Sequence, residues 1–185
     1  MAFSFKNLVL AAAVAAGSPV FAASAAGQEI PRAASTPDTP KNWVAPKHKI
    51  HAQALIDKLA AAHPEIESIT IHAVPAGMKD YTMIAGTFPD RIGNTSSPGD
   101  AITAVKGVTQ VESKWGTANF GKKVSIVAPV MDSAGRYLPA AMVIAFKQSP
   151  TSGLIDIDFL HPGVRVRNSI APMVPDFASL FAPAN

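Results

Sequence analysis

Apolar side chains recur at intervals of three and four residues between positions 47 and 63. This spacing is typical of a helix with one buried face, and Pro64 ends it. The residues that share the apolar face are Ala52, Leu55, Ile56, Leu59 and Ala62. Apolar and polar side chains then alternate over 68–75, and a second segment typical of a strand, 81–88, follows a short turn. The pattern therefore predicts a long N-terminal helix followed by a pair of antiparallel strands.

A polar loop over residues 89–100, rich in Gly, Pro, Ser and Asn, comes next. Asp100 is a candidate cap for a short helix that runs to Lys106, and Gly107 is a typical stop signal. The segment 108–113, Val-Thr-Gln-Val-Glu-Ser, predicts a short third strand, and a loop over 114–122 follows.

The stretch from 124 to 146 holds two apolar runs around the tetrapeptide at 132–135, which predicts a second hairpin. Asp132 fits turn chemistry, in which its carboxylate accepts hydrogen bonds from nearby backbone, better than it fits a catalytic acid. Pro129 and Pro139 lack a backbone donor, so we expect them at an edge or a bulge. Together these elements predict an α+β fold: an antiparallel sheet of about five strands with the N-terminal helix packed on it.

The order of these elements, together with the hairpin phrase at 128–138, Ala-Pro-Val-Met-Asp-Ser-Ala-Gly-Arg-Tyr-Leu, resembles a known family. It is similar to the extracytoplasmic Cache domains, the PAS-like sensor modules of bacterial receptors that are also called PDC sensors. The resemblance covers residues 47–147 and implies a PAS-like sheet that binds a small molecule. Cache domains usually lie between two membrane helices and feed an output module, whereas this sequence resembles a free-standing form.

The ends of the chain complete the predicted organisation. Residues 1–25 have the charge, apolar run and small-residue sites of a secretory signal peptide, with cleavage sites near residues 22 and 25 equally acceptable. Residues 26–46 read as a flexible linker, 47–150 as the Cache-like domain and 151–185 as a helical tail with short helices near 164–170 and 176–181. We therefore expect a periplasmic or secreted protein with no membrane span after signal cleavage.

The composition and the absence of known motifs limit the kinds of chemistry that we expect of this protein. The chain has no Cys, so disulfides and thiol catalysis are excluded, and a net charge of +3 with scattered basic residues does not suggest nucleic-acid binding. Phosphate-binding loops, nucleophile elbows and zinc-protease motifs are absent, so we expect neither an enzyme nor a cofactor. His48 and His51 share one helix face, but a solvated helix end explains them better than a metal site does.

The candidate ligand-binding residues come from the loop after the second strand and from positions that could face the same hollow of the sheet. Arg91 could clamp a carboxylate, or it could pair with Asp90 or Asp100 and only fix the loop. The aromatic candidates could equally be core residues. The full set is Arg91, Tyr81, His72, Lys106, Trp115 and Ser125.

The leading hypothesis is a non-catalytic Cache-like domain that binds a small organic ligand between the sheet and the loops 87–100 and 113–121. A membrane receptor or an envelope protein is a possible partner. The alternative is a structural or interaction protein of the cell envelope with a filled core, indicated by a solid face of Ile69, Ile71, Met83, Ile126, Val143 and Ile144. A hydrolytic enzyme would require His72 and an acid to meet in a cleft.

Overall fold

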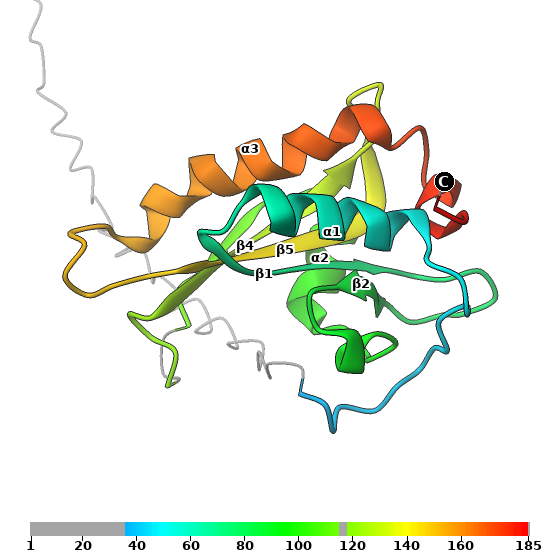
Figure 1. The fold of residues 1–185 in the computed structure, drawn as a ribbon, viewed down its shortest axis with the longest axis horizontal. Helices are drawn as coiled ribbons and strands as arrows, with labels where there is room; N and C mark the ends of the chain where they lie inside the picture. Colours follow the sequence, from blue (N-terminus) through cyan, green and yellow to red (C-terminus); the bar gives the residue numbers. More distant parts are fainter. Residues whose placement is uncertain (1–35, 115–117, 185) are drawn as a thin grey trace, which may run out of the picture.

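The computed structural model describes residues 36–114 and 118–184. Within these ranges five antiparallel strands form one sheet in the order β2-β1-β5-β4-β3 (Figure 1). The predicted α+β class and five-stranded sheet are thus confirmed. The strands are β1 (Ile66–Ala73), β2 (Thr82–Gly86), β3 (Gln110–Glu112), β4 (Lys123–Met131) and β5 (Tyr137–Lys147).

Three α-helices flank the sheet in the described part of the chain: α1 (His51–Ala62), α2 (Pro98–Lys106) and α3 (Leu160–Ile170). Helix α1 begins at His51 and not at residue 47. It spans 12 residues and is therefore shorter than the predicted N-terminal helix. Single turns of 3-10 helix are η1 (Pro89–Arg91), η2 (Asp156–Phe159), η3 (Ala171–Met173) and η4 (Ala178–Phe181). No described helix is both long enough and apolar enough to cross a membrane.

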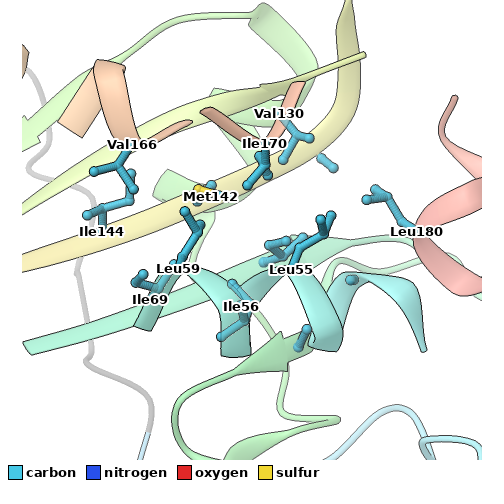
Figure 2. Close-up of a cluster of buried hydrophobic side chains, with 14 of the residues drawn as sticks. Leu55, Ile56, Leu59, Ile69, Val130, Met142, Ile144, Val166, Ile170 and Leu180 are labelled. Carbon is cyan, nitrogen blue, oxygen red and sulfur yellow. The ribbon is translucent and has the colours of Figure 1, made fainter. Parts of the chain in front are cut away.

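The first face of the sheet is apolar and carries α1 and α3. Ile69 on β1 and Ile126 on β4 both lie opposite Ile144 on β5, so these three side chains form a row across the sheet. Each of the three is fully buried. Figure 2 shows Leu55 and Leu59 of α1 and Val166 and Ile170 of α3 in one cluster with Ile69, Met142 and Ile144.

The second face carries α2 and has a different composition. Cross-strand partners place Thr70, His72 and Ser125 on this face, together with Val127, Val143 and Ala141. Helix α2 contributes Ala104 to a small apolar cluster with Val127 and Ala141. The six apolar residues listed in the filled-core hypothesis are therefore divided between two faces: the four isoleucines lie under α1 and α3, and Met83 and Val143 lie opposite His72 and Thr70.

The segment expected to be a tail packs into the same core as the sheet. Val166, Ile170 and Leu180 belong to the cluster that includes α1 and the apolar sheet face (Figure 2). At the end of the segment, Ala184 donates its backbone N–H to the carbonyl of Lys49, just before α1. The tail is therefore an integral layer of the fold.

The second hairpin is formed by β4 and β5, as predicted. The register of this pair shifts between Pro129 and Met131, so Pro129 lies at a bulge. Strand β3 pairs with β4 only between Ser125 and Val127, which leaves the side of β4 near Pro129 without a strand neighbour. Both observations explain why a residue with no backbone donor is accepted there.

Part of the expected linker lies against the folded core. Lys41 forms a β-bridge with Asn94, and the N–H of Asn42 donates to the carbonyl of Gly93. Trp43 packs edge-on against Phe181 with ring centroids 6.5 Å apart. The predicted signal peptide at 1–25 lies outside the described residues.

Candidate functional site

Tyr81 and Lys106, two of the sequence-predicted residues, line the same groove. The groove has a volume of about 520 Å³ and lies on the α2 side of the sheet, between the start of β2, the last turn of α2 and the start of β5. Its lining residues are Tyr81, Ala104, Val105, Lys106, Gly107, Tyr137, Leu138 and Pro139. Burial raises the pKa of the Tyr81 hydroxyl, so at neutral pH this group stays protonated and can donate a hydrogen bond.

Helix α2 places Lys106 in this groove. Ser97, not Asp100, is the N-cap: its hydroxyl accepts the N–H of Asp100, and the Asp100 carboxylate accepts the N–H of Ser97. This reciprocal capping box begins the helix three residues earlier than a cap at Asp100 would. The helix ends at Gly107, as predicted, where the backbone has φ +65°. An added Cβ on Gly107 would lie 3.0 Å from the ring of Tyr137.

His72 lies in a buried polar cluster instead of the groove. Its side chain extends from the second face of the sheet, with Nε2 2.8 Å from the Thr70 hydroxyl and Nδ1 2.8 Å from the Ser96 hydroxyl. A neutral imidazole can donate to one hydroxyl and accept from the other, so both ring nitrogens are satisfied. His72 therefore connects β1 to the loop that leads into α2.

Asp100 approaches the same imidazole. Its Oδ2 is 3.6 Å from Nδ1 of His72 and accepts a hydrogen bond from the Ser97 hydroxyl at 2.8 Å. His72 and an acid thus converge, as the hydrolytic hypothesis required. However, both residues are buried and neither lines the groove.

Ser125 also lies on the second face of the sheet, but in a different row of cross-strand partners from His72. On β4 it pairs with Glu112 on β3 and with Ala145 on β5, and Ala145 in turn pairs with Ser68 on β1. All four residues are buried. Ser125 and His72 share a face but not a row, and Ser125 does not line the groove with Tyr81 and Lys106.

Arg91 does not line this groove, and Trp115 lies outside the described residues. The Arg91 guanidinium stacks over the ring of Phe88, 4.2 Å from its centroid, within the short η1 turn. Trp115 falls in the undescribed segment 115–117. The predicted set therefore divides: two residues line the groove, two are buried on the same sheet face, and Arg91 stabilises a loop.

A second, larger groove of about 640 Å³ lies beside the N-terminal segment. It is mainly apolar, and Val44, one of its lining residues, is 90% exposed. Its lining residues are Lys41, Asn42, Trp43, Val44, Ala45, Met78, Pro89 and Ile92. Such a surface suits a protein contact better than an enclosed ligand.

Metal binding finds no support in the part of the chain that the structure describes. No group of three or more His, Cys, Asp or Glu residues lies close enough together there to hold an ion. His51 instead has its Nε2 2.8 Å from the carbonyl of Met173, so it connects α1 to the C-terminal layer.

Sequence reasoning missed three residues of this region. Tyr137 follows the hairpin turn, and its position opposite Gly107 depends on how α2 ends. Ser96 lies in the polar loop among several similar residues. Arg167 lies on α3, in the segment interpreted as a tail, and only the packing of α3 on β4 shows its environment.

Comparisons with known proteins do not assign a family. No family model and no curated protein matches the chain. Among solved structures, the inducer-binding domain of the transcription factor PobR from Acinetobacter is 14% identical, with a TM-score of 0.39 over 66% of this chain and 97% of that one. The repressor BlcR of Agrobacterium tumefaciens is also 14% identical, with a TM-score of 0.41 over 74% of this chain and 69% of that one. Likenesses this slight carry no conclusion about function.

Proposed function

We propose that this chain is a non-catalytic ligand-binding domain, a free-standing Cache-like sensor module that acts in the periplasm or outside the cell. Its ligand is a small organic molecule that lies in the groove bounded by Tyr81, Lys106 and Tyr137. The groove's volume of about 520 Å³ falls within the usual range of small-molecule sites. Its lining combines aromatic and aliphatic surface with a few polar groups, as such sites usually do.

One observation carries the proposal. Tyr81 and Lys106 are far apart in the sequence, yet the fold brings them to one concave surface on the α2 side of the sheet. That side also holds buried polar groups, whereas the opposite side is filled by α1 and α3. A ligand site is therefore expected in the groove between the end of α2 and the start of β5.

A thermal-shift screen of the mature protein tests this function. The panel contains carboxylates, amino acids and nucleobases, and a ligand should raise the melting temperature in proportion to its concentration relative to Kd. Val105 is 70% exposed and lines the groove, so Val105→Trp should fill the groove and abolish the shift without disturbing the core. Val44→Trp, in the other groove, is the matched control and should leave the shift unchanged.

Two outcomes would contradict the proposal. Either no compound of the panel stabilises the protein, or every stabilising compound acts equally on Val105→Trp. Export is tested separately by expressing the full chain and fractionating the cells. Mature protein outside the cytoplasm that begins near residue 23 or 26 would support the predicted signal peptide, and an intact chain in the cytoplasm would count against it.

The second candidate is an envelope interaction protein, and the apolar groove at Val44 and Met78 favours it. These two side chains are exposed, by 90% and 38%, and a partner would remove them from water. The double variant Val44→Ser, Met78→Ser separates the two functions. It should abolish partner binding under this alternative and leave ligand-induced stabilisation intact under the first proposal.

A further inference from the structure

Arg167 is a buried cation with few partners. Only 5% of the residue is exposed, and its Nη1 donates a hydrogen bond of 2.8 Å to the carbonyl of Pro129. Its Nε is also buried and has no hydrogen-bond partner in the part of the chain that the structure describes. No carboxylate within residues 36–114 and 118–184 forms an ion pair with it. Buried charges are normally paired, so this one requires an explanation.

The packing of α3 explains why Arg167 cannot withdraw into water. Gly163, one helical turn earlier, lies so close to β4 that an added Cβ would be 2.7 Å from side-chain atoms of Ile126. The neighbouring Val166 is buried in the main core. Helix α3 is therefore held against β4, and Arg167 stays beside the carbonyl that the bulge at Pro129 exposes.

Arg167 lies directly behind one wall of the ligand groove. Its guanidinium carbon is 5.6 Å from the centroid of the Tyr137 ring, and the same ring contacts Gly107, which follows Lys106. One positive side chain thus lies behind Tyr137, and a second, Lys106, lines the same groove as this tyrosine. On the same hairpin, both carboxylate oxygens of Asp132 accept hydrogen bonds from Arg136, so this acid does not neutralise Arg167.

Other charges near the groove do not cancel this potential. The C-terminal end of α2 adds a partial negative charge of about half a unit, which is smaller than the two full positive charges. The exposed Lys79 and Asp80, which precede Tyr81, carry opposite charges. A buried cation also acts through a medium of lower dielectric than water, so its field is screened less than that of a surface lysine.

We propose that the groove selects organic anions, and that Arg167 and Lys106 together provide this selectivity. The anionic group lies at Lys106, in the field of Arg167 behind Tyr137, and the apolar body of the ligand lies on Val105 and Pro139. The Tyr81 hydroxyl, which stays protonated, is available as a hydrogen-bond donor to the anion. This inference rests on the proposed function and adds the charge of the ligand and the residue on α3 that selects it.

Pairs of compounds that differ only in charge test the selectivity. Hexanoate with hexanamide and phenylacetate with phenylacetamide are titrated into the wild-type mature protein by calorimetry. Each carboxylate should bind about tenfold more tightly than its amide, which corresponds to about 1.4 kcal/mol. The ratio should fall as NaCl is added, because salt screens the interaction with the exposed Lys106.

Three variants assign the selectivity to residues. Lys106→Gln and Arg167→Met should each bring the ratio of carboxylate to amide affinity towards one. Arg167→Lys retains the charge and loses only the fork-shaped donor set, so it should keep most of the ratio. Lys58→Gln, an exposed position on α1, is the control and should change nothing. Lys106→Gln tests the inference even if Arg167→Met fails to fold, because Lys106 is exposed.

The outcomes separate this inference from the proposed function. If the amides bind as tightly as the carboxylates, or if Lys106→Gln leaves the ratio unchanged, the selectivity for anions is wrong. If neither pair binds but only neutral compounds stabilise the protein and Val105→Trp blocks them, the groove is a ligand site without this selectivity. If no compound binds at all, both proposals are overturned.

Discussion

Nδ1 of His72 lies 3.6 Å from Oδ2 of Asp100, and less than a tenth of either side chain is exposed. The two residues belong to β1 and α2, so their contact joins the sheet to the helix that forms one wall of the groove lined by Tyr81 and Lys106. Hydroxyls of Thr70 and Ser96 complete the cluster. Buried polar networks of this kind contribute to stability only while all of their members are satisfied.

Replacing His72 should therefore destabilise the fold more than an ordinary surface change. His72→Leu leaves two hydroxyls and the Asp100 carboxylate without the imidazole, which should lower the free energy of unfolding by about 2–3 kcal/mol. Urea denaturation measures this loss. His63→Leu removes a solvated contact with Glu65 and should change stability by less than about 0.5 kcal/mol. Equal effects of the two substitutions would show that the buried cluster contributes nothing special.

The carboxylate of Asp132 should make the second hairpin sensitive to acid. The backbone N–H of Arg136 is the main cause of a lowered Asp132 pKa; burial opposes it, and the Arg136 side chain and the N–H of Ala134 add to the lowering. A carboxyl with a lower pKa in the folded state than in the unfolded state stabilises the fold above the unfolded pKa, about 3.9. This contribution is lost as the pH falls through the lower, folded value.

The prediction is a difference in pH dependence between variants. Wild-type stability, measured by urea denaturation, should fall steeply below about pH 4, and Asp132→Asn should flatten this part of the curve. Arg136→Ala keeps both backbone donors, so it should retain most of the wild-type slope. A variant Asp132→Asn with the full wild-type slope would exclude Asp132 as a source of the acid sensitivity.

Gly163 tests whether packing or helix propensity decides the stability of α3. Alanine is favoured over glycine inside a helix by about 1 kcal/mol. At position 163, however, the new Cβ would lie 2.7 Å from Ile126, and overpacking of this kind typically costs about 1–3 kcal/mol. Gly163→Ala should therefore destabilise the protein, as measured by its melting temperature. Gly99→Ala in α2 meets neighbours only at 3.5 Å and should be neutral or mildly stabilising, whereas a stabilising Gly163→Ala would contradict the close packing of α3 on β4.

Alternation was enough to predict β1 and the faces of its residues from Ile69 onward. Ile69 and Ile71 were expected opposite Thr70 and His72, and the register confirms that arrangement. The tail was harder to interpret, because Pro162 and Gly163 suggest a break where α3 has its first turn. Proline is accepted in a first turn, and Gly163 is used there for close packing, so tertiary contacts override the local signal.

The site could be predicted only in part, because its contacts depend on distant segments. The pattern placed His72 on the polar face, but no spacing indicates that Asp100 reaches it after the chain has passed through β2 and the loop. The cap of α2 was wrongly assigned to Asp100, since both Ser97 and Asp100 are good capping residues and they cap reciprocally. Arg167 gave no signal at all, because an arginine that follows Arg165 in an apparently polar segment is ordinary.

The last prediction concerns Gly93, against which the backbone of residues 42–43 packs. It has φ +91°, and an added Cβ would clash with the backbone carbonyl of Trp43. Gly77 has a similar φ of +78° but nothing near its missing side chain. Alanine at either position is strained by about 1–2 kcal/mol, because both glycines adopt the left-handed region. Any further loss of stability in Gly93→Ala is therefore due to the clash with Trp43.

Gly93→Ala should therefore lower the melting temperature more than Gly77→Ala and should release residues 40–43 from the core. Release would break the hydrogen bond from Asn42 to Gly93 and expose the peptide bond after Lys41 to trypsin. The measurement is the rate of cleavage after Lys41, compared between the two variants and the wild type. Faster cleavage in Gly93→Ala alone would place residues 40–43 in the folded domain. Equal rates in all three proteins would show that the contact between Gly93 and Trp43 does not protect this segment from cleavage.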